Sequence, residues 1–287
     1  MIIDTYEDFA AYWSVASSKT LEQQITLWQT RYMAKYPELL EKQTRSYQRE
    51  GYDWQEVARK HVFPKMKETF PLMQEARENL LALCEPVTER ANKRLGLDSE
   101  IVFVIYVGIG CGAGWATLYE GQPACLLGLE NIAECRWHTK DKLEGLLAHE
   151  IGHLAHMIWR GEWETFESAE KDPLFQLYSE GFAQRCEHVI VGRETWHQAQ
   201  DKSWVSWCEL NKGCLAQEFL KRTRKKLSTR DFFGSWFDVK GKKETGYFLG
   251  HAFILELEKK HSLRQIALFD IDKVRKLAVN YLKSTLN

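Results

Sequence analysis

Apolar side chains recur at helical spacing through most of this chain. Between residues 4 and 97, for example, Leu80, Cys84, Val87 and Ala91 follow one another at the intervals of one helix face. We therefore expect residues 4–97 to be mostly helix. The same periodicity predicts later helices over residues 141–160, 173–191 and 246–260, and a last helix or pair of helices over residues 263–284. Asp172 and Thr245 are expected to cap two of these helices, and Gly161 and Gly192 to end two of them.

The pattern changes to that of strands between residues 101 and 130. Residues 101–107 form a continuous β-branched and aromatic run, which is typical of a buried strand. Two more strands are expected over residues 115–119 and 124–130, and the glycine-rich residues 108–114 predict a hairpin or bulge before them. The sequence thus predicts an α+β fold that is mainly helical, with a small mixed or antiparallel sheet.

Composition and charge indicate an ordinary globular protein. The chain has 287 residues, of which 44% are hydrophobic and 28% charged, and its net charge of −1 gives no overall field for nucleic acid or an acidic membrane. No apolar run is long enough to span a bilayer, and the first residues lack a signal-peptide pattern. Seven cysteines without C-x-x-C spacing indicate reduced thiols. We expect a cytoplasmic protein without nucleic-acid or membrane partners.

No internal repeat or linker interrupts the sequence. Residues 1–287 are therefore expected to form a single compact unit. Within it, residues 1–97 are expected to form a helical N-terminal part, and residues 98–287 to carry the chemistry.

The candidate chemistry begins in the helix predicted over residues 141–160. His149-Glu150-Ile151-Gly152-His153 is an H-E-x-x-H motif. Residues four apart share one face of a helix, so both imidazoles can reach one Zn²⁺ at ~2.0–2.1 Å. Glu150 lies about 100° further round the helix, close enough to the open metal position to take a proton from water. The helix is apolar nearly all round, and burying two histidines and a glutamate there is costly unless a metal satisfies them. The other interpretation is a chance match of three fixed residues.

Further residues resemble a known group of enzymes. H-E-x-x-H followed by a glutamate on a later helix resembles the gluzincin metallopeptidases, the clan of thermolysin and aminopeptidase N. The closer likeness is to aminopeptidase N, whose N-E-G-F-A motif corresponds to Ser179-Glu180-Gly181-Phe182-Ala183. Residues 247–250 (Y-F-L-G) stand where that family has Y-E-K-G, and the resemblance spans about residues 124–255.

This resemblance implies a thermolysin-like catalytic core, with the sheet beside the zinc helix, and a role for each matching residue. Glu180 would be the third zinc ligand, Glu187 an acceptor that orients a ligand, and Tyr247 the group that stabilises the oxyanion. Other carboxylates that follow the motif remain alternatives for the third ligand: Glu164, Glu167 and Glu170.

Glu130 is a candidate for substrate binding. Gly128-Leu129-Glu130-Asn131 resembles the G-x-M-E-N motif, whose glutamate anchors the free α-amine of the substrate in the aminopeptidase family. Here one residue between the glycine and the glutamate is missing. A slip of one residue turns a strand side chain to the opposite face. An ordinary carboxylate at the end of a strand is the competing interpretation.

These residues together predict a zinc-dependent peptidase. Zinc would be held by His149, His153 and Glu180, Glu150 would act as general base, and a peptide or protein would be the substrate. A zinc hydrolase with a non-peptide substrate is one alternative, because the same metal site can serve other chemistry. A non-catalytic zinc-containing binding module is another, although a structural site has no use for Glu150. The sequence leaves the oligomeric state open.

Overall fold

The chain divides into two compact units. The computed structural model describes residues 1–199, 201–234 and 236–286, except for the side chains of Glu164 and Glu167. The first unit contains residues 1–92 and 98–147, and the second contains residues 93–97 and 148–287. The helix that carries the motif begins in the first unit and ends in the second. That all 287 residues act as one catalytic unit stays a prediction.

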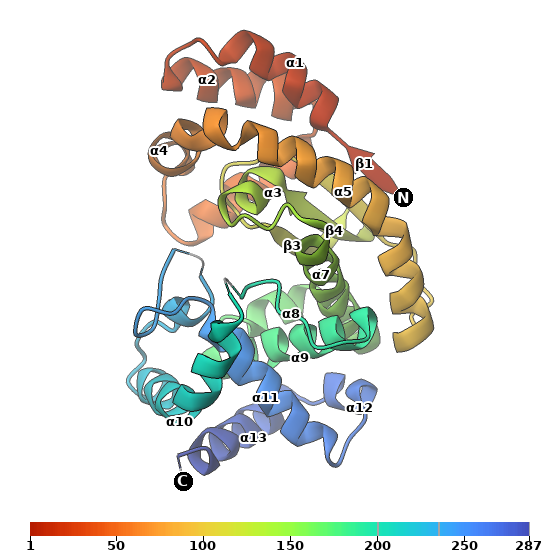
Figure 1. Cartoon of the computed structure of the whole chain (residues 1–287), viewed down its shortest axis with the longest axis vertical. Coiled ribbons are helices and arrows are strands. Elements are labelled where there is room, and N and C mark those ends of the chain that lie inside the picture. The colour runs from red at the N-terminus through yellow and green to blue at the C-terminus, as the bar shows by residue number, and fades with distance from the viewer. Residues whose placement is uncertain (200, 235, 287) are drawn as a thin grey trace. The chain divides into compact units, whose positions relative to one another are not determined.

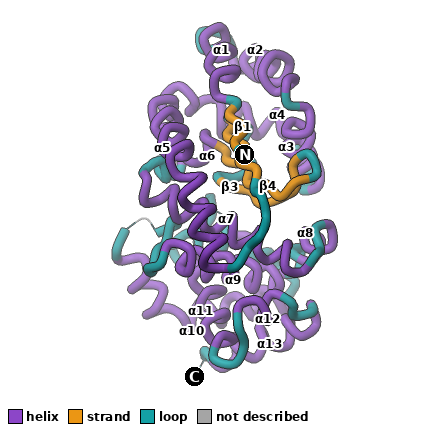
Figure 2. Tube along the Cα trace, turned by 90° about the vertical axis from the view of Figure 1, so that its right-hand side faces the viewer, coloured by secondary structure: helices purple, strands orange, loops and turns teal. Residues whose placement is uncertain are grey.

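The first unit is a set of helices with one small sheet (Figures 1 and 2). The sheet has four strands in the order β1-β2-β4-β3, and it is mixed, because β3 runs antiparallel to β4 while the other pairs are parallel. The strands are β1 (Ile2–Asp4), β2 (Val102–Tyr106), β3 (Gly114–Tyr119) and β4 (Gln122–Gly128). The helical elements are α1 (Tyr6–Ala16), α2 (Leu21–Leu27), η1 (Trp28–Tyr32), η2 (Met33–Lys35), α3 (Pro37–Arg49), α4 (Trp54–Val57), η3 (Ala58–Val62), α5 (Phe63–Leu95), α6 (Leu129–Glu134) and the start of α7 (Lys140–Arg160).

The pattern of buried residues explains the sheet. All five residues of β2 are buried, as expected for a continuous apolar run between two neighbouring strands. The short strand β1 was not predicted. It is too brief to show a period, and its place is set by pairing with β2, in which Ile3 lies opposite Val104. The predicted α+β fold, mainly helical with a small sheet, is confirmed.

The second unit consists, over its described residues, of helices joined by loops, with one isolated β-bridge between Val239 and Lys242. Its elements are the end of α7, α8 (Glu164–Ala169), α9 (Pro173–Val191), α10 (Ser203–Arg224), η4 (Arg230–Phe232), α11 (Thr245–Glu258), α12 (Leu263–Ala267) and α13 (Ile271–Ser284). Local sequence sets several helix ends, as predicted. Asp172 caps α9 by accepting hydrogen bonds from the Leu174 and Phe175 amides, and Gly192 ends it in a left-handed conformation with φ of 85°. Gly161, with φ of 66°, likewise follows the end of α7.

Two predicted helix and strand ends were wrong. Thr245 was expected to cap the helix after it, but α11 already includes Thr245, and Glu244 precedes the helix in a left-handed conformation with φ of 60°. The buried Thr245 hydroxyl therefore has no capping bond. Strand β4 was expected to reach Glu130, but it ends at Gly128 and α6 begins at Leu129. A short apolar run does not distinguish a strand end from a helix start.

Helices α9 and α11 approach closely enough that their backbones touch. A Cβ atom on Gly181 would lie 2.1 Å from the Gly250 carbonyl carbon, and one on Gly250 would lie 2.3 Å from the Leu177 oxygen. Only glycine fits at either position. This contact fixes Glu180, which precedes Gly181 on α9, relative to the first turn of α11.

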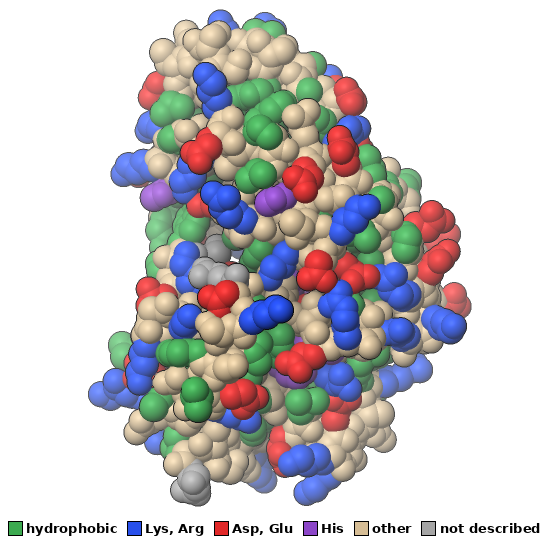
Figure 3. Space-filling model, viewed as in Figure 1, with side chains coloured by type: hydrophobic (Ala, Val, Ile, Leu, Met, Phe, Trp, Pro, Cys, Tyr) green, Lys and Arg blue, Asp and Glu red, His purple; other side chains and the backbone are tan. Residues whose placement is uncertain are grey.

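The drawn surface and the cysteines do not indicate a further site. Basic and acidic side chains are interspersed over the face drawn in Figure 3. All seven cysteines are unpaired thiols. No helix within the described residues is both long enough and apolar enough to cross a bilayer.

Gly250→Ala tests the close contact between α9 and α11. Helix propensity alone would favour alanine by ~0.8–1.0 kcal/mol. We expect the clash with α9 to outweigh this gain and to lower the free energy of unfolding by ~1–3 kcal/mol, measured by urea denaturation. Ser206→Ala, at an exposed position of α10, is the control and should change stability by less than ~0.5 kcal/mol. A Gly250→Ala protein as stable as wild type would contradict the close contact.

Candidate metal centre

The motif helix α7 and helix α9 are brought together by a glycine inside the motif itself. A Cβ atom on Gly152 would lie 2.7 Å from the Cys186 Cβ and 3.0 Å from the Ala183 Cα. With no side chain at Gly152, α9 can lie against the motif. The two motif histidines therefore face the α9 residue Glu180.

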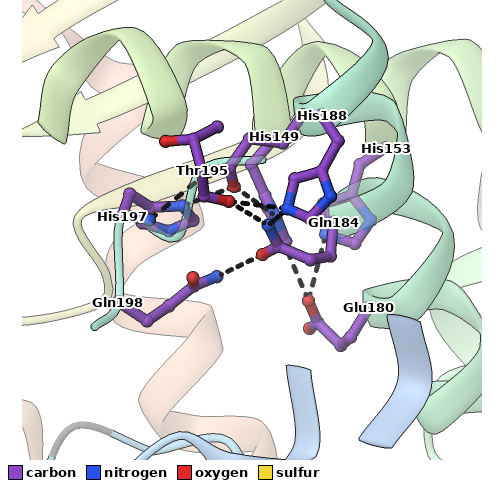
Figure 4. Close-up of polar contacts among 9 residues, drawn as sticks. His149, His153, Glu180, Gln184, His188, Thr195, His197 and Gln198 are labelled. Carbon is purple, nitrogen blue, oxygen red and sulfur yellow. Dashed lines mark hydrogen bonds and ion pairs between the residues drawn. The ribbon is translucent and has the colours of Figure 1, made fainter. Parts of the chain in front are cut away.

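Two imidazoles and one carboxylate converge at this point (Figure 4). His149 Nε2 and His153 Nε2 each lie 3.3 Å from Glu180 Oε2. Two ligands at 2.0–2.1 Å from a tetrahedral zinc ion are roughly 3.3–3.4 Å apart. Both distances to the Glu180 oxygen match this spacing, and one ligand atom from each of the three residues lies within 4.8 Å of the others, so the group could hold one small cation. The structure brings together the three residues expected to bind the metal.

The other ring nitrogens of the histidines face away from this point. His153 Nδ1 lies 3.4 Å from the Ser179 hydroxyl, which in turn donates a 2.6 Å hydrogen bond to Glu170 Oε1. His149 Nδ1 lies 3.6 Å from Glu187 Oε2, beyond hydrogen-bond distance. If each Nδ1 carries its proton toward these acceptors, both Nε2 lone pairs point at the Glu180 carboxylate. Three electron-pair donors then meet, and a cation is what would hold them together.

The electrostatics of the group also favour positive charge. Burial by itself would lower the pKa of His153, but the adjacent Glu180 carboxylate raises that pKa to about 9. Burial would raise the pKa of Glu180, but the charge of His153 and hydrogen bonds from both imidazoles hold it well below its usual range. The carboxylate is therefore ionised and available as a ligand.

A second group of possible ligands shares His149. His149, Glu187 and His197 are all buried, and this group could also hold a metal ion. Its Glu187 Oε2 and His197 Nδ1 atoms are only 2.7 Å apart, which is the length of a charge-assisted hydrogen bond. Two ligands of one zinc ion would lie further apart. The group of His149, His153 and Glu180 therefore has the more suitable spacing for zinc. That these three residues bind the metal, with Glu187 in a supporting role, stays a prediction.

Glu150 and Tyr247 both belong to the same unit as the metal group. Glu150 is buried next to His149 in α7, and its charge acts on His153. The ring of Tyr247, in the first turn of α11, meets the His149 ring edge-on with 5.5 Å between centroids. The Tyr247 hydroxyl points toward the Phe233 carbonyl oxygen, 3.5 Å away. Their catalytic roles stay predictions.

Of the three alternatives for the third ligand, the structure describes the side chain of Glu170. Glu170 accepts a hydrogen bond from the Ser179 hydroxyl, which lies next to His153 Nδ1, so in this arrangement it stands behind a ligand. The side chains of Glu164 and Glu167 lie outside the described residues.

Glu130 lies in the first unit, and its carboxylate already has partners. Its two oxygens accept hydrogen bonds from the Gly108 and Gly110 amides, at 2.6 and 3.1 Å. Burial raises the pKa of Glu130 to about 7, although these hydrogen bonds oppose the shift. The glycine-rich loop that follows β2 thus wraps around an internal carboxylate. Glu130 lies in helix α6 and not at a strand end, which corrects the premise of the predicted amine anchor.

Sequence reasoning did not identify His197 or the role of Ser179. His197 lies in a loop after α9, where no period predicts which side chain turns inward. The one signal was the dense run of aromatic and polar residues from Thr195 to Gln198 just beyond the helix end. Ser179 belongs to the S-E-G-F-A motif, but the sequence indicated a role only for its neighbour Glu180.

Comparisons of the chain with models of protein families, with curated proteins and with solved structures found no match. The function of this chain is therefore inferred from the geometry of the site and from the motifs themselves.

Metal analysis after purification in zinc-containing buffer tests the assignment. We expect one divalent ion per chain in the wild type, and its loss in His149→Ala and in Glu180→Ala, because two remaining ligands hold zinc poorly. Glu256→Ala, which changes an exposed glutamate of α11, is the control and should keep the ion. Full occupancy in Glu180→Ala would show that another residue is the third ligand.

Proposed function

We propose that this chain is a zinc-dependent peptidase of the gluzincin type. The observation that carries the proposal is the convergence of His149 Nε2, His153 Nε2 and Glu180 Oε2, with Glu150 next to the first histidine. Two imidazoles and one carboxylate suit zinc well, and three protein ligands leave a coordination position open, which is the pattern of catalytic zinc sites.

The proposed chemistry divides between the ion and the protein. Zinc held by these three residues would supply a Lewis acid that polarises a carbonyl group and makes a water molecule more acidic. The Glu150 carboxylate takes a proton from the attacking water and passes it to the nitrogen of the leaving amine. One carboxylate thus serves as base in the first half of the reaction and as acid in the second.

Two other residues support this chemistry. Tyr247 is proposed to donate a hydrogen bond from its hydroxyl to the oxyanion, which requires that hydroxyl to leave the Phe233 carbonyl. Glu187 lies behind His149 and orients that ring.

The substrate class rests on the resemblance to gluzincins. A peptide fits the role of Glu150, because cleavage of an amide requires a proton for the leaving nitrogen. Glu130 is not given a part in this proposal, because both of its carboxylate oxygens already accept backbone hydrogen bonds.

Glu150→Gln separates the chemistry from metal binding. The amide keeps the size of the side chain but cannot take a proton at neutral pH. We expect zinc content and fold to be unchanged and the hydrolysis of a quenched-fluorescent peptide library to fall by ~10²–10⁴-fold.

Glu209→Gln, at an exposed position of α10, is the matched control and should cleave peptides like wild type. Wild-type turnover in Glu150→Gln would remove Glu150 from the mechanism. A zinc-loaded wild type that cleaves none of the peptides would overturn the peptidase proposal in favour of a different substrate or a non-catalytic zinc protein.

A further inference from the structure

The segment after α9 is held against that helix by three side chains of one helix face. Gln184, Glu187 and His188 are spaced so that they lie together on α9. Gln184 Nε2 donates a 2.9 Å hydrogen bond to the Thr195 carbonyl oxygen, and His188 Nε2 lies 2.7 Å from the same oxygen. Figure 4 shows these contacts. We call residues Thr195–Gln198 the strap.

Gln198 forms a further contact of the strap. Its Nε2 atom donates to Gln184 Oε1 at 3.0 Å, and the side chain is buried. This bond does not involve Glu187. The strap therefore has contacts at Thr195 and Gln198 that secure it without touching Glu187, and a different contact, made by His197, that reaches the metal group.

His197 binds both oxygens of the Glu187 carboxylate. Its backbone amide donates to Glu187 Oε1 at 3.3 Å, and its Nδ1 atom lies 2.7 Å from Glu187 Oε2. Glu187 is fully buried and His197 is 3% exposed. A carboxylate held at both oxygens by one residue has a fixed orientation. Without a side-chain donor, burying it would be costly.

The same carboxylate faces the metal group. Glu187 Oε2 lies 3.6 Å from His149 Nδ1, and the rings of His149 and His197 are 5.0 Å apart between centroids. His149 Nδ1 has no hydrogen-bond partner among the described residues. His197, Glu187 and His149 thus form a buried row that ends at a metal-binding imidazole.

We propose that His197 is a positioning residue that fixes the Glu187 carboxylate behind His149 and thereby strengthens metal binding by His149. This inference rests on the proposed function for the identity of the metal-binding residues. Carboxylates that accept the second N–H of a metal-binding histidine orient its ring and make it more basic, and their loss typically weakens metal affinity 10–100-fold. His197 acts one step further out, because it determines where that carboxylate lies. The competing account is that His197 only secures the strap.

Two amide substitutions separate these accounts. In asparagine, the side-chain amide nitrogen lies as many bonds from the backbone as His197 Nδ1, so His197→Asn keeps a donor toward Glu187. In glutamine the nitrogen lies one bond further out, so His197→Gln keeps the polarity and loses that donor. His197→Phe keeps a ring and removes both ring nitrogens, and with them the side-chain donor to Glu187. Gln198→Ala is the control, because it loosens the strap and leaves the contact with Glu187 in place.

The measurement is the zinc dissociation constant, obtained by competition with a chelator on proteins with wild-type circular dichroism. We expect His197→Gln and His197→Phe to bind zinc about 10–100-fold more weakly, and His197→Asn and Gln198→Ala to stay within about threefold of wild type. The visible spectrum of the Co²⁺-loaded protein should shift in His197→Gln and remain unchanged in Gln198→Ala. If His197→Phe does not fold, the zinc affinities of His197→Asn and His197→Gln are compared instead, and their difference tests the inference.

Three results would overturn the inference: wild-type zinc affinity in His197→Gln, equal losses in His197→Asn and His197→Gln, or an equal loss in Gln198→Ala. The outcome is distinguishable from the fate of the proposed function. If His197 controls zinc affinity but wild type cleaves no peptide, the inference stands and the peptidase proposal fails. If wild type cleaves peptides and its zinc affinity does not depend on His197, the peptidase proposal stands and the inference about His197 fails. A wild type that binds neither zinc nor cobalt would overturn both.

Discussion

Two imidazole nitrogens and one carboxylate oxygen meet among mostly buried side chains, and the rest of the site depends on this arrangement. His149 and His153 each bring Nε2 to 3.3 Å from the same oxygen of Glu180. Where neither Nε2 atom carries a proton, lone pairs this close repel one another, and the surrounding protein offers little solvent to reduce that cost. A proton on one histidine relieves part of it. A divalent cation would relieve all of it, which is why we propose that these side chains form a metal centre.

The packing of the helices serves the same arrangement. Three glycines allow it: Gly152 lets α9 lie against the motif, while Gly181 and Gly250 let α9 and α11 touch. An alanine at any of them would meet a backbone or Cβ atom within 3.0 Å. The glycines of the motifs are thus required by the approach of the helices that bear the ligands. Behind the two imidazole rings lie Glu187, 3.6 Å from His149 Nδ1, and Ser179, 3.4 Å from His153 Nδ1.

The sequence predicted the parts of the molecule that local chemistry determines. The motif helix, the helix with Glu180 and their ends follow from periodicity and capping, and the spacing of H-E-x-x-H places both histidines on one face whatever the surrounding fold. It did not predict β1, whose position depends on pairing with β2, a strand about a hundred residues away. It also missed His197, because a loop has no period. Glu130 was misplaced because one residue decides between a strand end and a helix start.

Anomalous diffraction at the zinc absorption edge, from crystals grown with zinc, tests the central claim most directly. The account predicts one strong anomalous peak at about 2.0–2.1 Å from His149 Nε2 and His153 Nε2, and at a similar distance from a Glu180 oxygen. A peak between His149 Nδ1, Glu187 and His197 would contradict the ligand assignment and the positioning role of His197. The absence of any peak near His149 would contradict the metal centre altogether.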